Sequence, residues 1–141
     1  MRRKIITVFF ILSLLITACG SITPAAEPAT ADPSVLFVIV KADGATYNVT
    51  LEAVKALPLA QLSAEGKVEE GPYLSDVLAL AGVAEFTEVT LTGSSNPATL
   101  TFEQVDENTI LDFNNHGTMK LASTYIPKAN WTKDVAKITV K

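Results

Sequence analysis

Few side chains in this sequence have the chemistry of a catalytic group, and they are widely spaced. The 141 residues include one histidine, His116, and one cysteine, Cys19. His116 lies in an Asn-Asn-His-Gly turn, where a base or metal ligand would need carboxylates or amides as its partners. We interpret it as an exposed structural residue. No serine lies in a Gly-x-Ser-x-Gly elbow, so the sequence predicts no catalytic residue.

Two groups of acidic residues are candidates for a site. Glu69 and Glu70 could act as a carboxylate pair, but neighbours on a strand point to opposite faces, so we expect solvated charges. Asp106, Glu107 and Asp112 could offer oxygen ligands to calcium, but their spacing matches no known calcium loop. We therefore predict no metal site and no cofactor-binding residue.

Ring-bearing side chains are candidates for a ligand groove. Aromatic residues among strands usually belong to the core or its rim, so this groove is the weaker alternative. A ligand there would be a small molecule. The candidate residues are Tyr73, His116, Tyr125 and Trp131, and Phe113 is a further candidate.

The N-terminus has the features of an export signal. Three basic residues at 2–4 precede an apolar stretch, 5–16, that is shorter than the about 20 residues of a membrane-spanning helix. Ile16-Thr17-Ala18-Cys19 resembles the lipobox of bacterial lipoproteins. That resemblance implies cleavage before Cys19 and attachment of a diacylglycerol to its sulfur. The alternative is an ordinary signal peptide with an incidental cysteine.

This interpretation divides the chain into three parts. Residues 1–18 are expected to be a lipoprotein signal peptide, and residues 19–34 to be the lipidated cysteine and a disordered tether rich in Ala, Thr and Pro. Residues 35–141 are expected to form the folded domain. The protein would then be anchored by fatty acids such as palmitate on the outer side of a bacterial cell envelope. The outer membrane is favoured, if the host has one, because Gly20-Ser21 lacks an inner-membrane retention Asp.

Charge excludes one class of partner. The whole chain carries 11 basic and 15 acidic residues, a net charge of −4. Removal of residues 1–18 takes away three basic residues and no acid, which changes the net charge to −7. Because an acidic domain without a basic patch repels phosphates, we expect no nucleic acid as a partner.

A short helix over 74–81 is expected to organise the domain. Leu74, Val77, Leu78 and Ala81 form one apolar face, and Gly82 suits the left-handed residue that follows a helix. Ser75, or a residue just before it, is expected to cap the helix. The face must pack on a sheet, since a helix this short is not stable alone.

Strand patterns surround this helix. The segment 35–41 is a continuous apolar run, which predicts a strand buried on both faces. Further strands are expected at 46–51, 87–92, 98–101, 109–113 and 135–140. Short helices are expected at 52–56 and after Thr101, where Gln104 completes a capping box. Segment 59–68 is expected to be an extended arm with a turn at Glu65-Gly66. Segment 119–126 has a mixed pattern that predicts no single element. The fold class is therefore α+β, rich in strands, with two or three short helices.

The order of these segments resembles the sulfite-oxidase-like, molybdopterin-binding family. Val-Thr-Leu-Glu-Ala-Val-Lys-Ala-Leu-Pro at 49–58 is similar to its strand followed by a TLEDLKALP-type helix. Tyr-Leu-Ser-Asp-Val-Leu-Ala-Leu-Ala-Gly-Val at 73–83 is similar to its helix ending in Ala-Gly-Val. Segments 88–93, 102–112, 114–121 and 134–140 resemble its later elements in the same order. The resemblance implies a sulfite-oxidase-like fold for nearly all of residues 35–141.

The departures from that family concern its cofactor. Its enzymes bind molybdenum through a cysteine before the central helix, but segment 59–70 contains none. Both arginines of the chain lie within the expected signal peptide, which removes the usual bidentate phosphate ligand. Gly93-Ser94-Ser95 replaces the family's Asp-Gly-Tyr signature. No functional residue of the family carries over to this sequence.

Three functions remain open at this point. The first is a non-catalytic, membrane-tethered binding or accessory domain outside the cytoplasm, with a small molecule or an envelope protein as its partner. The second is a periplasmic molybdopterin-dependent oxidoreductase or its redox subunit. The third is an envelope scaffold without a ligand.

Overall fold

The computed structural model describes residues 32–141. The expected signal peptide, Cys19 and residues 20–31 of the expected tether lie outside these residues. The last three residues assigned to the tether, 32–34, form a turn in which the Ser34 carbonyl accepts a hydrogen bond from Leu51 N. Within the described part of the chain, no helix is long and apolar enough to cross a membrane.

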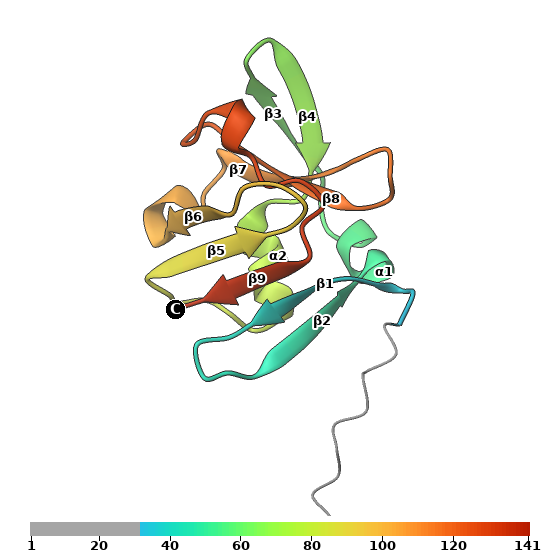
Figure 1. The fold of residues 1–141 in the computed structure, drawn as a ribbon, viewed down its shortest axis with the longest axis vertical. Helices are drawn as coiled ribbons and strands as arrows, with labels where there is room; N and C mark the ends of the chain where they lie inside the picture. The colour runs from blue at the N-terminus through green and yellow to red at the C-terminus, as the bar shows by residue number, and fades with distance from the viewer. Residues whose placement is uncertain (1–31) are drawn as a thin grey trace, which may run out of the picture. The chain divides into compact units, whose positions relative to one another are not determined.

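A five-stranded sheet forms the main layer of the fold (Figure 1). Its strand order is β2-β1-β9-β5-β6; β1 and β9 are parallel, and the other neighbours are antiparallel. The closing strand of the chain therefore lies in the middle of the sheet. The strands are β1 (Val35–Val40), β2 (Thr46–Thr50), β5 (Glu88–Thr92), β6 (Ala98–Thr101) and β9 (Lys137–Val140).

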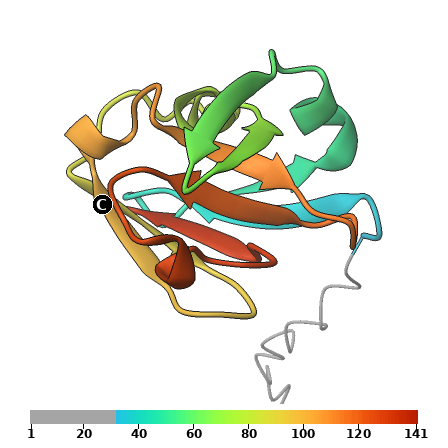
Figure 2. The same ribbon diagram turned by 90° about the horizontal axis from the view of Figure 1, so that it is seen from above.

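Two hairpins and two short helices complete the domain. Figures 1 and 2 show the β3–β4 hairpin standing next to the β7–β8 hairpin, outside the five-stranded sheet. The elements are α1 (Leu51–Lys55), β3 (Ala60–Ala64), β4 (Lys67–Gly71), α2 (Leu74–Leu80), β7 (Thr109–Phe113) and β8 (Met119–Ser123), with 3₁₀ turns at Phe102–Gln104 and Lys128–Asn130. The prediction of a strand-rich α+β domain with short helices is confirmed.

Helix α2 packs on the sheet as its apolar spacing predicts. Leu74, Val77 and Leu78 are fully buried, and they belong to one core cluster with residues of β1, β5, β6 and β9. Gly82 has a φ of +71°, the left-handed conformation expected after the helix. The N-cap residue is Tyr73, two residues before Ser75, but the expected side-chain cap is wrong, because no side chain of residues 32–141 caps the helix.

The expectation that the first strand is buried on both faces is also wrong. Phe37 and Ile39 are buried, whereas Leu36, Val38 and Val40 are partly exposed. The same alternation runs through β5, β6 and β9. One face of the sheet therefore packs on α2 and the core, and the other face is more open to solvent.

The two segments that had no clear pattern form strands. The expected arm is the β3–β4 hairpin, and its turn at Glu65-Gly66 is confirmed, with φ values of +48° and +78°. The mixed segment after residue 118 contains β8. Gly71 brings the end of β4 against β7, because a Cβ atom there would lie 1.9 Å from the Leu111 carbonyl oxygen.

Candidate binding site

A second, smaller core lies between the two hairpins. It contains Leu62 and Ala64 of β3, Ile110 of β7, Ala122 of β8 and Trp131. Trp131 is only 2% exposed. Its indole Nε1 donates to the Ser123 carbonyl at 3.0 Å and to the Ile126 carbonyl at 3.2 Å. The tryptophan ring is therefore held in one orientation, with its polar atom fully paired.

Four charged side chains gather beside this tryptophan. Lys120 Nζ donates to Glu69 Oε2 and contacts Asp112 Oδ2, each at 2.9 Å. Lys128 Nζ lies 3.2 Å from Glu69 Oε1. The Lys120 and Lys128 ammonium groups also lie 5.7 Å and 5.2 Å from the centroid of the Trp131 ring. Both lysines are thus paired with carboxylates and placed at cation–π distance from one aromatic ring.

This cluster shifts the pKa values of its members in opposite directions. Burial acts to raise the pKa of Glu69, but hydrogen bonds from Lys120 and Lys128 outweigh it and lower that pKa to about 2. The pKa of Asp112 is raised by burial and by its neighbour Glu69, against the effect of Lys120. Burial acts to lower the pKa of Lys120, but its two carboxylates hold that pKa above the usual value. The cluster therefore favours the charged forms of Glu69 and Lys120 and disfavours the charged form of Asp112.

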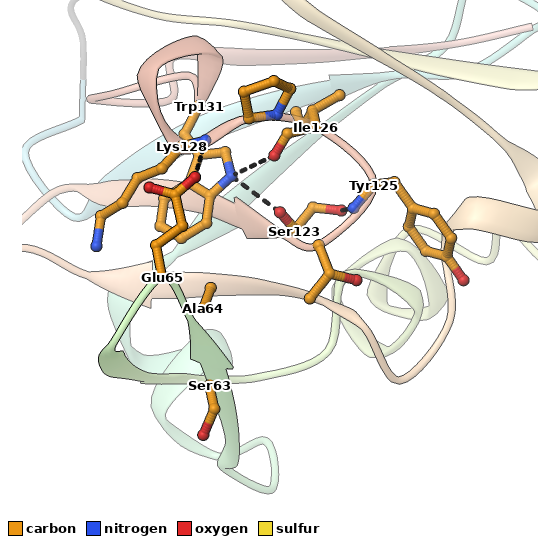
Figure 3. A pocket seen from close by; sticks show the side chains of 10 residues that line it. Ser63, Ala64, Glu65, Ser123, Tyr125, Ile126, Lys128 and Trp131 are labelled. Carbon is orange, nitrogen blue, oxygen red and sulfur yellow. Dashed lines mark hydrogen bonds between the residues drawn. The ribbon is translucent and has the colours of Figure 1, made fainter.

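A cavity of about 530 Å³ opens beside the tryptophan (Figure 3). One wall comes from the end of β3, where Ser63, Ala64 and Glu65 lie. The opposite wall is the chain segment 123–128, which follows β8, and Trp131 also lines the cavity. Both apolar and polar residues line these walls, so the cavity offers apolar contact beside Ile126 and Trp131 together with hydrogen-bonding groups.

Tyr125 stands at the rim of this cavity and is 41% exposed. Its hydroxyl donates to Asp106 Oδ2 at 2.6 Å, which holds the pKa of Tyr125 above its usual value. Burial acts to raise the pKa of Asp106, but the Tyr125 and Asn108 donors hold it below its usual range. The bond therefore fixes the tyrosine side chain at the mouth of the cavity.

His116 lies elsewhere, in the exposed turn between β7 and β8. Its backbone N–H donates to Asn114 Oδ1, which closes the turn. Next to this turn, the Asp134 carboxylate accepts hydrogen bonds from Ser94, Thr118 and Asn114, which lower its pKa. The backbone of Asp134 has a φ of +47°. This polar cluster joins the turn to the loop that precedes β9.

The structure brings together two of the candidate groove residues. Tyr125 and Trp131 line the same cavity. Tyr73 packs against the Trp131 core and forms a β-bridge with Ile110, but it does not line the cavity. His116 is separate from it. Phe113 packs against the main core.

The acidic residues also differ from expectation. Glu69 is not a solvated charge: it is 9% exposed and bridges two lysines. Sequence reasoning missed Lys120 and Lys128 altogether. The register of β7 and β8 places Asp112 directly opposite Lys120, and a recognised hairpin over 109–123 would have revealed this pair.

No part of residues 32–141 gathers three or more His, Cys, Asp or Glu side chains in a geometry that could hold a metal ion. Asp106 is bonded to Tyr125 and Asn108, whereas Asp112 is paired with Lys120. Asp106 and Asp112, two of the three acidic residues weighed as a calcium set, therefore have separate partners.

Comparisons with known proteins find a likeness among solved structures. No protein-family model matches the chain, and no curated protein matches it. Among solved structures, the chain is similar to the sulfane dehydrogenase SoxCD from Paracoccus pantotrophus, with a TM-score of 0.56 and 19% sequence identity. The similar region covers 74% of this chain and 37% of that chain. At this identity the likeness shows a shared fold and nothing more about function.

Proposed function

We propose that this protein is a lipid-anchored binding domain of the sulfite-oxidase-like fold, located outside the cytoplasm and without catalytic activity. Two independent lines support the fold family: the ordered sequence segments at 49–58 and 73–83, and the structural likeness to the sulfane dehydrogenase. The observation that carries the binding role is the cavity lined by Trp131, whose neighbouring lysines are already neutralised by carboxylates.

The residues present do not fit a molybdopterin cofactor. A molybdenum site of this family needs a thiolate, and residues 32–141 contain no cysteine. The cofactor's phosphate needs cationic donors, preferably the planar fork of an arginine, and this part of the chain has no arginine. Lys120 and Lys128 are the cations near the cavity, and both are engaged by Glu69. This disagreement favours a binding role over the oxidoreductase alternative.

The proposed location rests on the N-terminal sequence. Cleavage before Cys19 would leave a cysteine that carries a diacylglycerol and a further acyl chain, and two or more chains anchor a protein stably. The segment 20–31 would then separate the domain from the bilayer. An anchored domain with a cavity and no cofactor ligands is suited to hold a partner near the membrane.

Fractionation of cells that express the full chain tests the anchored part of this proposal. The wild-type protein should incorporate radiolabelled palmitate and sediment with membranes. The Cys19→Ala variant should incorporate no label and appear in the soluble fraction, while Ser21→Ala, a matched change two residues away, should behave as wild type. Wild-type protein that sediments with membranes without any label would contradict the lipid anchor.

A further inference from the structure

We propose that the open edge of β3 and the adjoining cavity bind an extended peptide segment of a partner protein, which adds a strand beside β3. This inference rests on the binding role proposed above and names its ligand class. The segment would place one apolar side chain in the cavity beside Trp131 and a basic side chain next to Glu65.

The geometry of the β3–β4 hairpin determines which main-chain groups are free. The positive φ values of Glu65 and Gly66 define a two-residue turn, so the flanking pair Ala64 and Lys67 is the first hydrogen-bonded pair. Pairs alternate along an antiparallel ladder, which makes Ser63 and Val68 a non-hydrogen-bonded pair. The N–H and C=O groups of Ser63, and of Gln61 two residues earlier, therefore point away from β4.

The outer edge of β4 supports this conclusion about which main-chain groups point outward. The same alternation turns the N–H of Glu70 away from β3, and that N–H donates to Asp112 Oδ1 of β7 at 3.4 Å. The outer edge of β4 is thus turned toward β7. The outer edge of β3 has no such neighbour among residues 32–141, where β3 pairs with β4 alone.

The sequence of β3 does nothing to block strand addition. Exposed edge strands usually carry a lysine, a proline or a bulge that prevents pairing with another chain. β3 reads Ala-Gln-Leu-Ser-Ala and contains none of these features. The outer strands of the main sheet, β2 and β6, are also edges, but none of their residues lines this cavity.

The cavity lies where side chains of an added strand would point. Leu62 and Ala64 face the Trp131 core, and Ser63, Ala64 and Glu65 line the cavity next to it (Figure 3). An added strand would run about 4.8 Å from β3 with alternate side chains on that same face. This arrangement combines a main-chain ladder, which gives affinity, with a pocket for one side chain, which gives specificity.

Charge indicates the character of the peptide. The whole chain has a net charge of −4, and residues 1–31 contribute +2 through three basic residues and one acid. The remaining 110 residues therefore carry a net charge of −6. At the cavity, the Lys128 ammonium is paired with Glu69, whereas the Glu65 carboxylate, among residues 32–141, accepts only a backbone N–H, that of Lys128, at 3.4 Å. An apolar side chain flanked by lysine or arginine therefore complements this surface best.

The test uses random linear peptides displayed on phage and selected on the purified full chain. Enriched peptides are then synthesised, and their dissociation constants are measured by fluorescence of Trp131, the single tryptophan of the chain. Ser63→Pro removes an outward N–H of β3, and proline is tolerated at such edge positions. Val68→Pro removes the equivalent outward N–H on the other edge of the same hairpin and is the matched control. Ser63→Ala keeps the N–H and controls for the hydroxyl.

We expect the selected peptides to contain a basic residue beside an apolar one. We also expect Ser63→Pro to weaken their binding by about tenfold or more, while Val68→Pro and Ser63→Ala bind as wild type. If Ser63→Pro does not fold, peptides N-methylated at alternate amides replace it, and one register of methylation should abolish binding.

Three results would overturn the inference. These are failure to enrich any peptide, equal binding by Ser63→Pro and wild type, and a concentration-dependent dimer that Ser63→Pro abolishes, which would assign the edge to a second copy of the chain. All three leave the proposed non-catalytic role intact, because that role fails only if the protein holds a molybdenum cofactor.

Discussion

Glu69 Oε2 accepts a hydrogen bond from Lys120 Nζ at 2.9 Å, and this bond joins the β3–β4 hairpin to the β7–β8 hairpin across 51 positions of sequence. Both are largely buried: 11% of the Glu69 side chain alone and 22% of the Lys120 side chain alone are exposed. The Lys120 ammonium also lies 5.7 Å from the centroid of the Trp131 ring. The pair therefore holds the β3–β4 hairpin, which forms one wall of the cavity, against the β7–β8 hairpin, whose following segment 123–128 forms the other wall.

Loss of the Glu69 charge should destabilise this junction. In Glu69→Gln, Lys120 and Lys128 lose their shared anionic partner while the side-chain shape is kept. We expect the free energy of unfolding to fall by about 1.5–3 kcal/mol, the usual value of hydrogen bonds to charged groups, as measured by urea denaturation. Glu70→Gln, on the exposed face of the same strand, should change it by less than about 0.5 kcal/mol. Equal effects of the two substitutions would contradict the bridging role.

The same carboxylate should make stability depend on acid pH. The pKa of Glu69 is about 2 in the folded protein and 4.5 ordinarily, so its contribution is complete above pH 4.5 and is lost as the pH falls toward 2. Asp112 acts in the opposite direction, because its raised pKa favours proton uptake by the folded state. Unfolding of wild type and Glu69→Gln, compared at a series of pH values, isolates the contribution of Glu69. The difference between the two should shrink as the pH falls from 4.5 to about 2, and a constant difference would show that Glu69 titrates normally.

Gly71 should be the glycine least tolerant of substitution near the site. A Cβ atom there would lie 1.9 Å from the Leu111 carbonyl oxygen, so Gly71→Ala must displace β4 from β7. We expect a loss of about 3 kcal/mol or more in the free energy of unfolding, at the upper end of overpacking effects. Gly117→Ala is the control: its φ is +77°, but apart from its two chain neighbours no residue of 32–141 has an atom within 4 Å of the added Cβ, so only the backbone cost of about 1–2 kcal/mol applies. A smaller loss for Gly71→Ala than for Gly117→Ala would exclude the close approach.

The elements with strong local patterns were predictable from sequence. The apolar face of α2 follows from Leu74, Val77 and Leu78 at helical spacing, and Gly82 marks its end. The capping box is also confirmed, since Thr101 N donates to Gln104 Oε1 at 2.9 Å. These features depend on neighbours within a few residues, which is the range over which a sequence pattern is informative.

The site depends on contacts that local patterns do not encode. β3 contains Ala, Gln and Ser, which have weak strand preference, and it is a strand because Leu62 and Ala64 pack on the Trp131 core. Glu69 meets Lys120 only through the register of two separate hairpins. The β3–β4 hairpin and the cavity beside it therefore depend on tertiary packing rather than on local sequence patterns.

The molybdenum content of the purified full chain tests the central claim most directly. The protein is expressed in a bacterium that makes the molybdopterin cofactor, passed through gel filtration and analysed for metals together with sulfite-dependent dye reduction. Because residues 32–141 offer neither a thiolate nor an arginine, we predict that molybdenum stays far below one atom per chain and that no dye is reduced. Stoichiometric molybdenum that survives gel filtration would contradict the binding role and restore the oxidoreductase alternative.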